Sequence, residues 1–561
     1  MRIRTPHFTF PAALRVALPG PLPAVAWWAL AVAVLVAVPI ASVGANLLFG
    51  GGSGTWSHLA ATVLPSYVAN TLVLCAGVAL GTVLIGVGTA WLVSMHQFPG
   101  RALFEWALVL PLAMPAYVMA YTYTDLLQFV GPVQTWLRAA LDWQAGDYWF
   151  PDVRTVGGAA LMFVFVLYPY VYLLARAAFL ERASGMLEVG RSLGYGPWRS
   201  FFRISLPLAR PAVAAGATLA LMETLADYGA VSYFGVPTFT TGIYRAWFSL
   251  GDRVAAAQLA GALLGVVALV LSLERWSRGR ARFNNTTGRN RPQPGHRLRG
   301  GAAAAAALAC LLPLALGFLL PAGVLLKMAL NGGDAEFGAR FVELARNSFL
   351  LAALTAGIAV LLAVLLAYAG RLSRHPLLRA ASRIVSLGYA VPGSVIAVGV
   401  LIPVTRLDHW LAQLVQAAGG ANPGLLLTGG VAALVYAYLV RFLTVSLRTV
   451  EAGLGQITAS MDDAARSLGH SQLATLRRVH LPLLSGSMLT AALLVFVDVM
   501  KELPATLVMR PFNFDTLATQ AYTLASDERL AEASTASLMI VAVGLLPLLV
   551  LSWQIRRSRR R

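Results

Sequence analysis

The chain has 561 residues, of which 58% are hydrophobic and 12% are charged, and its mean hydropathy is +0.70. Soluble domains are about 25% charged, so this composition excludes an ordinary soluble protein and indicates a membrane protein with several spans. The net charge of +19 would suit nucleic-acid binding, but the arginines lie in short segments between apolar runs, so we expect no nucleic-acid partner. Cys75 and Cys310 both lie within apolar runs, which leaves no disulfide framework and no cysteine metal site.

Twelve apolar runs are long enough to cross a membrane as helices, which need about 20 residues each. The first is longer than the core of a cleavable signal peptide, so we expect it to be a retained span. The predicted fold class is an all-α polytopic membrane protein with about twelve transmembrane helices. The predicted spans are 25–48, 67–94, 103–129, 157–179, 211–232, 254–273, 302–329, 347–369, 380–404, 425–446, 485–506 and 533–554.

A polar, arginine-rich linker at 274–300 divides these spans into two groups of six. Most lysines and arginines fall on one side of the resulting map, including the linker and the C-terminal Arg556–Arg561. The positive-inside rule therefore places both termini and the linker in the cytoplasm. We interpret the linker as a tether close to anionic membrane lipid.

An internal repeat links the two halves. The segment Met186–Pro211 returns 275 positions later as Met461–Gly486. Six spans is an even number, so the halves run in the same direction and form parallel repeats with a pathway expected between them. We predict a first repeat over 1–273 and a second over 301–561. The identical pairs are Met186 and Met461, Arg191 and Arg466, Ser192 and Ser467, Leu193 and Leu468, Gly194 and Gly469, Arg203 and Arg478, Leu206 and Leu481, Pro207 and Pro482, and Leu208 and Leu483.

The repeat extends toward the start of each half with an offset of 277. Asn70 falls on Asn347, Pro115 on Pro392, and Trp91 on Tyr368. Within the repeated segment each half carries a glycine, Gly194 or Gly469, that breaks a polar helical run. A Leu-Pro pair follows it before the next span. We therefore expect a helix, a turn and a second helix to project into the cytoplasm from each half.

The chain has no phosphate-binding P-loop. That motif needs Gly-Lys followed by Ser or Thr, and the lysines of this chain, Lys327 and Lys501, follow Leu326 and Met500. We expect that the chain is not an enzyme, that it holds no cofactor of its own, and that ATP would be hydrolysed by another polypeptide.

Four acidic residues lie inside predicted spans, in two matching pairs. Glu223 and Asp227 are four residues apart on the fifth span, and Asp498 and Glu502 occupy the matching positions on the eleventh. Helical periodicity predicts that each pair shares a helix face. A carboxylate inside the bilayer is costly, so these groups should face protein or water. We interpret them as pathway residues and transient oxygen ligands for a hard cation. The alternative that stays open is structural pairing of Lys501 with Asp498, Glu502 or Glu223.

Tyrosines cluster near these acids. Most are expected to pack or to lie at the membrane interface, and some, Tyr228 among them, to line the pathway. They are Tyr117, Tyr121, Tyr123, Tyr168, Tyr170, Tyr172, Tyr228 and Tyr233.

The repeated segments resemble the EAA loops of permeases of ABC importers, although neither copy has the complete Glu-Ala-Ala. We call 181–210 the first coupling segment and 449–484 the second. The resemblance implies that each docks in a cleft of an ATPase subunit, and hence two ATPase copies that bind ATP and Mg. The matching residues are Glu188, Gly190, Arg191, Gly194, Leu206 and Pro207, and Asp463, Ala465, Arg466, Gly469, Leu481 and Pro482.

Longer stretches, 222–260 and 501–533, look like the fused permeases of periplasmic ferric iron importers. That resemblance implies a multi-pass protein of the bacterial inner membrane that receives ferric iron from a periplasmic binding protein. The segments Tyr233–Asp252 and Arg510–Glu532 would be outer loops, mobile in character, that face this protein. Import of thiamine, polyamine or phosphonate, a proton-coupled secondary transporter, and more remotely a membrane-embedded enzyme remain alternatives.

Overall fold

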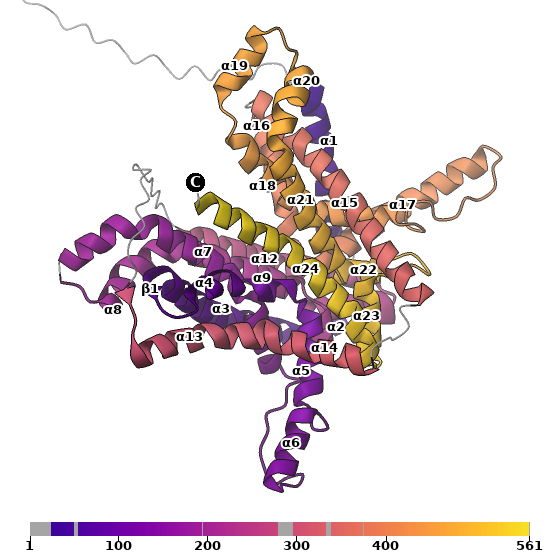
Figure 1. The fold of residues 1–561 in the computed structure, drawn as a ribbon. Helices are drawn as coiled ribbons and strands as arrows, with labels where there is room; N and C mark the ends of the chain where they lie inside the picture. The colour runs from indigo at the N-terminus through magenta and orange to yellow at the C-terminus, as the bar shows by residue number, and fades with distance from the viewer. Residues whose placement is uncertain are drawn as a thin grey trace, which may run out of the picture.

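The computed structural model describes residues 24–49, 54–192, 194–278, 296–332, 338–373 and 375–559, and these are overwhelmingly helical (Figure 1). Within these ranges eleven helices are long and apolar enough to cross a membrane, or twelve if the bent pair Arg101–Ala113 and Ala116–Leu141 forms one span. The predicted all-α polytopic fold is therefore confirmed.

The first half consists of a helical series with one two-residue strand. Its elements are α1 (Ala24–Phe49), α2 (Gly54–Thr62), α3 (Leu64–Met95), β1 (His96–Gln97), α4 (Arg101–Ala107), the 3₁₀ turn η1 (Leu110–Ala113), α5 (Ala116–Leu127), α6 (Pro132–Leu141), α7 (Val156–Ser192), α8 (Pro197–Ser200), the π turn η2 (Phe201–Ser205), α9 (Leu206–Ala226), α10 (Gly229–Tyr233), α11 (Phe239–Tyr244), the π turn η3 (Arg245–Ser249) and α12 (Arg253–Arg278).

The second half has a similar series of helices and begins with a two-residue strand. Its elements are β2 (His296–Arg297), α13 (Gly300–Leu314), the π turn η4 (Ala315–Leu319), α14 (Leu320–Gly332), α15 (Ala339–Leu372), α16 (Pro376–Leu387), the 3₁₀ turn η5 (Gly388–Ala390), α17 (Gly393–Ala417), α18 (Ala432–Gly455), α19 (Ala459–Ser467), α20 (Gln472–Thr475), the π turn η6 (Leu476–His480), α21 (Leu481–Met500), α22 (Pro504–Met509), α23 (Leu517–Ser526) and α24 (Leu530–Arg559). The strands β1 and β2 pair in parallel.

The predicted continuous spans 103–129 and 380–404 are wrong in the same way. Each is broken at a proline, Pro115 and Pro392, which adopts an extended conformation and precedes a new helix. A proline disfavours the helical region for the residue before it, and Met114 and Val391 are both extended. In the first half the two pieces meet at 92°. The predicted span 425–446 is displaced, because α18 begins at Ala432 and runs to Gly455.

Three long helices pack together in each half: α3, α7 and α9 in the first, and α15, α18 and α21 in the second. Figure 1 shows these bundles as two arms, with α8 at the tip of one and α19 at the tip of the other. The helices α6 and α17 project at the opposite ends of the arms. The arms therefore present their coupling segments at separate points.

The first helix of each half packs on the other half. Helix α1 contacts α15, α16 and α17, and Tyr436 donates a hydrogen bond from its hydroxyl to the carbonyl of Leu35 at 2.5 Å. In return, the α13–α14 segment contacts α3, α4 and α5, with the Tyr123 hydroxyl donating to the carbonyl of Leu316 at 2.5 Å. This exchange ties the two halves into one body, and leucines such as Leu80 and Leu84 face outward as lipid-facing residues do.

Candidate functional site

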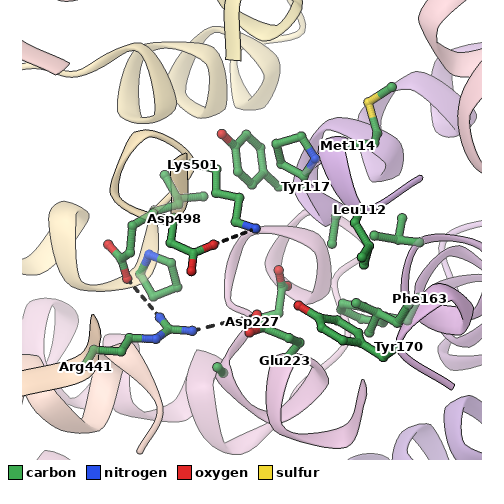
Figure 2. A pocket seen from close by; sticks show the side chains of 18 of the residues that line it. Leu112, Met114, Tyr117, Phe163, Tyr170, Glu223, Asp227, Arg441, Asp498 and Lys501 are labelled. Atoms are coloured by element: carbon green, nitrogen blue, oxygen red, sulfur yellow. Dashed lines mark hydrogen bonds and ion pairs between the residues drawn. The ribbon is translucent and has the colours of Figure 1, made fainter. Parts of the chain in front are cut away.

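A cavity of about 100 Å³ lies between the two halves, where the break at Pro115 meets the ends of α9 and α21. Figure 2 shows acidic side chains from both halves and basic side chains from the second half converging on it. All four predicted intramembrane acids line this cavity, together with Lys501. The structure therefore brings together residues that lie up to 279 positions apart in the chain, from Glu223 to Glu502.

The members of each acidic pair do not share a helix face, contrary to the prediction. Helix α9 ends at Ala226, so Glu223 lies in its last turn and Asp227 lies beyond its end. Helix α21 likewise ends at Met500, which separates Asp498 from Glu502. The prediction applied the helical period across the points where α9 and α21 end. Within each pair, the second acid therefore has a different structural role from the first.

The second acid of each pair caps a short helix. Asp227 accepts hydrogen bonds at Oδ1 from the backbone N–H of Ala230 at 2.8 Å and of Val231 at 3.3 Å, at the start of α10. Glu502 accepts from the N–H of Ala505 at 3.0 Å and of Thr506 at 3.1 Å, at the start of α22. The first N–H groups of a helix have no partner within the helix, and a carboxylate there also meets the favourable end of the helix dipole. The two acids thus fix the backbone around the cavity.

Arg441, on α18, links the two halves. Its Nη1 lies 3.3 Å from Oε1 of Glu502 and its Nη2 lies 3.8 Å from Oε2 of Glu223 (Figure 2). The side chain of Glu502 is 2% exposed and that of Arg441 is 9% exposed. Buried charges need partners, and one guanidinium supplies a partner to a carboxylate from each half.

Glu223 has a second cross-half contact, because the hydroxyl of Tyr389 donates to its Oε1 at 2.9 Å. Gly393 leaves room for the Arg441–Glu502 pair: a Cβ added there would lie 2.7 Å from Oε1 of Glu502 and 2.9 Å from Nη1 of Arg441. Sequence reasoning missed Arg441, Tyr389 and Gly393. An arginine inside an apolar run, as at position 441, was a signal that could have identified the first of them.

Lys501 pairs with Asp498, with Nζ and Oδ1 3.0 Å apart. This is one of the pairings that the sequence left open, so structural pairing and cavity lining occur together. Among the residues that line the cavity there are four acids but two cations. The lining therefore carries an excess of acidic groups.

Both cations come from the second half. With the repeat offset of 275, Arg441 corresponds to Val166 and Lys501 to Ala226, and all four of these residues line the cavity. The acids are symmetric and the cations are not. Within the described ranges, no group of three or more His, Cys, Asp or Glu side chains is arranged to hold a metal ion. The four acids do not form a preassembled metal site in this conformation.

Some of the predicted tyrosines line the cavity, and the others pack within the protein. Tyr117 and Tyr170 line the cavity, and Figure 2 places Tyr170 beside Glu223. Tyr228, predicted to line the pathway, is not among the lining residues; its ring stacks on that of Tyr244 with centroids 3.6 Å apart. Five others are buried in the protein: Tyr121, Tyr123, Tyr168, Tyr172 and, partly, Tyr233.

The two coupling segments share their local geometry from Gly194 and Gly469 onward, whereas before these residues α7 is unbroken and α18 is separated from α19. Gly194 and Gly469 adopt left-handed conformations, with φ of 73° and 78°. A short helix and a π turn follow at matching positions, and then Leu206-Pro207 begin α9 and Leu481-Pro482 begin α21. The predicted helix–turn–helix arrangement is present in both copies.

The other predicted coupling residues lie in α7 in the first copy and in α19 in the second. Glu188, Gly190 and Arg191 lie within α7, in a stretch whose side chains are outside the described set. In the second copy Ala465 is buried, and Asp463 forms an exposed ion pair with Arg466.

Replacing Gly469 with alanine is expected to destabilise the turn of the second coupling segment by about 1–2 kcal/mol, because a Cβ is disfavoured at positive φ. Amide hydrogen exchange over residues 459–475 should become about tenfold faster. The control is Gly486→Ala, within α21, where no atom lies within 4 Å of the added Cβ and alanine favours the helix. Equal exchange in the two variants would contradict the role of the left-handed turn.

The predicted outer loops each contain a short and largely buried helix, α11 in the first and α23 in the second, while residues such as Phe248 and Phe512 are exposed. Thr238 and Thr241 form a capping box at the start of α11, and Thr516 and Thr519 form one at the start of α23. The Thr240 hydroxyl donates to the carbonyl of Asp227 at 2.8 Å, which ties α11 to the cavity. Threonine, which is common in both segments, serves here as a helix cap.

Comparison with known proteins identifies the family. The family model for the "Binding-protein-dependent transport system inner membrane component" matches residues 82–278 and 359–561. The Fe(3+)-transport system permease protein FbpB 2 of Haemophilus influenzae is 27% identical over 490 residues, which cover 86% of this chain and 89% of that protein. The molybdenum transport system permease protein ModB of Escherichia coli K12 is 34% identical over 207 residues, 35% of this chain and 87% of that protein.

A solved structure was also found, a bacterial alginate ABC transporter in complex with an alginate pentasaccharide-bound periplasmic protein. It has 16% identity and a TM-score of 0.34, and covers 46% of this chain and 94% of that one. The family match extends over most of the chain and occurs once in each half of the helical body. The chain therefore belongs to the family of inner membrane components of binding-protein-dependent transport systems.

Proposed function

We propose that this permease moves ferric iron into the cytoplasm. The observation that carries the proposal is its similarity, along 86% of its length, to a permease named for Fe(3+) transport. The ModB relative aligns with only 35% of the chain, so its similarity reflects one permease unit rather than the fused pair.

The composition of the cavity supports a cationic cargo. Four carboxylates and two cations line it, with the phenols of Tyr117 and Tyr170 nearby. Carboxylate and phenol oxygens are hard donors that suit a hard cation. Molybdate and sulfate are anions, and an excess of acidic groups in a medium of low dielectric constant would repel them. The charge of the lining therefore favours iron over an anionic cargo such as molybdate or sulfate.

The size of the cavity supports an ion rather than an organic molecule. Sites for small organic ligands usually have volumes of about 300–1,000 Å³. A volume of about 100 Å³ suits an ion with a few waters better than thiamine or a polyamine. The acids that pair with Arg441 and Lys501 would exchange these partners for the ion as it passes, since a conducting site must also release its ion.

Partners follow from the family and from the two coupling segments. We propose that two copies of a separate ATPase, which binds ATP and Mg, dock on the segments 181–210 and 449–484. A periplasmic solute-binding protein would dock at the opposite ends of the two arms. The chain would lie in the bacterial inner membrane, in contact with lipid and with both termini in the cytoplasm. Membership of this family argues against a proton-coupled secondary transporter.

The proposal is tested in proteoliposomes that contain the chain, its ATPase and its binding protein. ATP-dependent uptake of radioactive ferric iron is expected, and an excess of molybdate or sulfate should leave it unchanged. The control omits the ATPase. Uptake of molybdate or sulfate in place of iron would contradict the proposed cargo, and iron uptake without the ATPase would contradict the proposed mechanism.

A further inference from the structure

The second coupling segment is held to the membrane helices by Arg371, in the last turn of α15. Its Nε donates to Oδ2 of Asp462 at 2.8 Å, and its Nη1 and Nη2 donate to the carbonyls of Leu454 and Ile457, both at 2.9 Å. Asp462 belongs to α19, Leu454 to the end of α18, and Ile457 to the turn between them. One guanidinium therefore joins three pieces of backbone.

Asp462 extends this joint to the next span. Its Oδ1 lies 2.6 Å from Nε2 of His480, whose side chain is 1% exposed. His480 is the last residue of the π turn that leads into α21. The Tyr368 hydroxyl, one turn before Arg371 on α15, donates to the carbonyl of Gln472 at 2.6 Å. Helix α19 is thus connected through one carboxylate to both α15 and α21.

The carboxyl group of Asp462 is ionised at neutral pH. Partial burial raises the pKa of Asp462, but the hydrogen bonds from Arg371 and His480 outweigh this effect and hold the pKa below its ordinary value. The carboxylate is therefore ionised, and its contacts with the guanidinium are charge-assisted and directional.

The first coupling segment carries different residues at the same repeat positions. Ser94 stands where the second copy has Arg371, Leu187 where it has Asp462, and Ser205 where it has His480. None of the three carries a charge. Trp91 occupies the position of Tyr368, and its ring lies 4.9 Å from that of Phe201, in the π turn η2.

Trp91 also packs edge-on against Phe179 of α7, with centroids 5.5 Å apart. Hydrogen bonds fix direction as well as distance, whereas apolar burial is non-directional. Hydrogen bonds therefore restrict rotation of the helix that they hold. An aromatic contact restricts the orientation of its helix less. Among the described side chains, the second coupling segment is therefore held by a polar joint at Arg371, and the first has an aromatic contact at Trp91.

We propose that Arg371 is a positioning residue for energy coupling: through Asp462 it converts movement of α19 into movement of α15 and α21. The inference rests on the proposed docking of an ATPase on each segment.

The test compares Arg371→Met with Ser94→Ala, the matched change in the first half. Uptake of iron and hydrolysis of ATP are measured in the same proteoliposomes. For Arg371→Met, uptake per ATP hydrolysed should fall by about tenfold, the scale of coupling between sites, while hydrolysis stays within about twofold of the original chain. Arg371→Lys keeps the charge without the planar fork and should recover part of the ratio. Ser94→Ala should leave it unchanged.

A second readout needs no cargo. Amide hydrogen exchange of α19 in the assembled importer should be faster in Arg371→Met and unchanged in Ser94→Ala. If Arg371→Met does not assemble, Asp462→Asn, which keeps the shape of the side chain, is measured in the same two ways. An uptake ratio within about twofold of the original, or unchanged exchange in α19, would overturn the inference. Absence of ATP-dependent iron uptake by the original chain would instead contradict the proposed function, and the exchange experiment would still decide the role of Arg371.

Discussion

Replacing Glu223 with glutamine and Asp498 with asparagine in one chain is expected to lower ferric iron uptake by a factor on the order of a hundred. These are the first acids of the two symmetric pairs, and both line the cavity between the halves. Neither accepts a hydrogen bond from the start of α10 or α22, so the change removes two negative charges without removing a helix cap. Uptake into proteoliposomes measures the effect.

The double variant should still fold, at some cost in stability, because the amide oxygens can still accept hydrogen bonds from Arg441 and Lys501. Copurification of the ATPase with the variant at the original ratio checks this. The control is Glu343→Gln, at an exposed position near the start of α15, which should transport normally. Normal uptake by the double variant would remove Glu223 and Asp498 from the proposed pathway and leave them as structural partners of Arg441 and Lys501.

Replacing Arg441 with methionine is expected to destabilise the protein by about 3–5 kcal/mol. The change leaves Glu502, which is 2% exposed, and Glu223 without the guanidinium that both contact. Removal of one partner from a buried pair costs more than the pair itself contributes, because an uncompensated charge stays buried. Unfolding in mixed detergent micelles by added SDS measures the loss.

The matched control for this change is Arg448→Met, on the same helix. Arg448 pairs with Glu451 at 2.9 Å, but its side chain is 59% exposed, so the expected loss is below about 1 kcal/mol. In the double variant Arg441→Met with Glu502→Gln, part of the lost stability should return, because no charge is then stranded at Glu502. An Arg441→Met variant as stable as Arg448→Met would show that the cross-half contact is not structural.

Local sequence features predicted the parts of the site that depend on local structure. The glycines of the coupling segments were predicted to break helices, and Gly194 and Gly469 both adopt positive φ. The carboxylates at Glu223 and Asp498 were predicted to face protein or water, and both line an internal cavity. These predictions succeeded because a left-handed turn favours glycine and a charge avoids lipid, wherever the rest of the chain lies.

Predictions of where helices end failed. The helical period placed Glu223 and Asp227 on one face, but α9 ends between them because Asp227 caps the next helix. The proline breaks in the third and ninth spans were missed because hydropathy does not register a change of direction.

What the sequence determined by itself is a membrane body of two parallel repeats with paired polar turns, because apolar length and repeated spacing are properties of consecutive residues. Only the tertiary structure decided which partners the buried charges have. Arg441 meets Glu223 from the other half, and Arg371 of α15 meets Asp462 of α19. Such contacts depend on where packing places helices that are far apart in the chain, and no periodicity along the sequence records that placement.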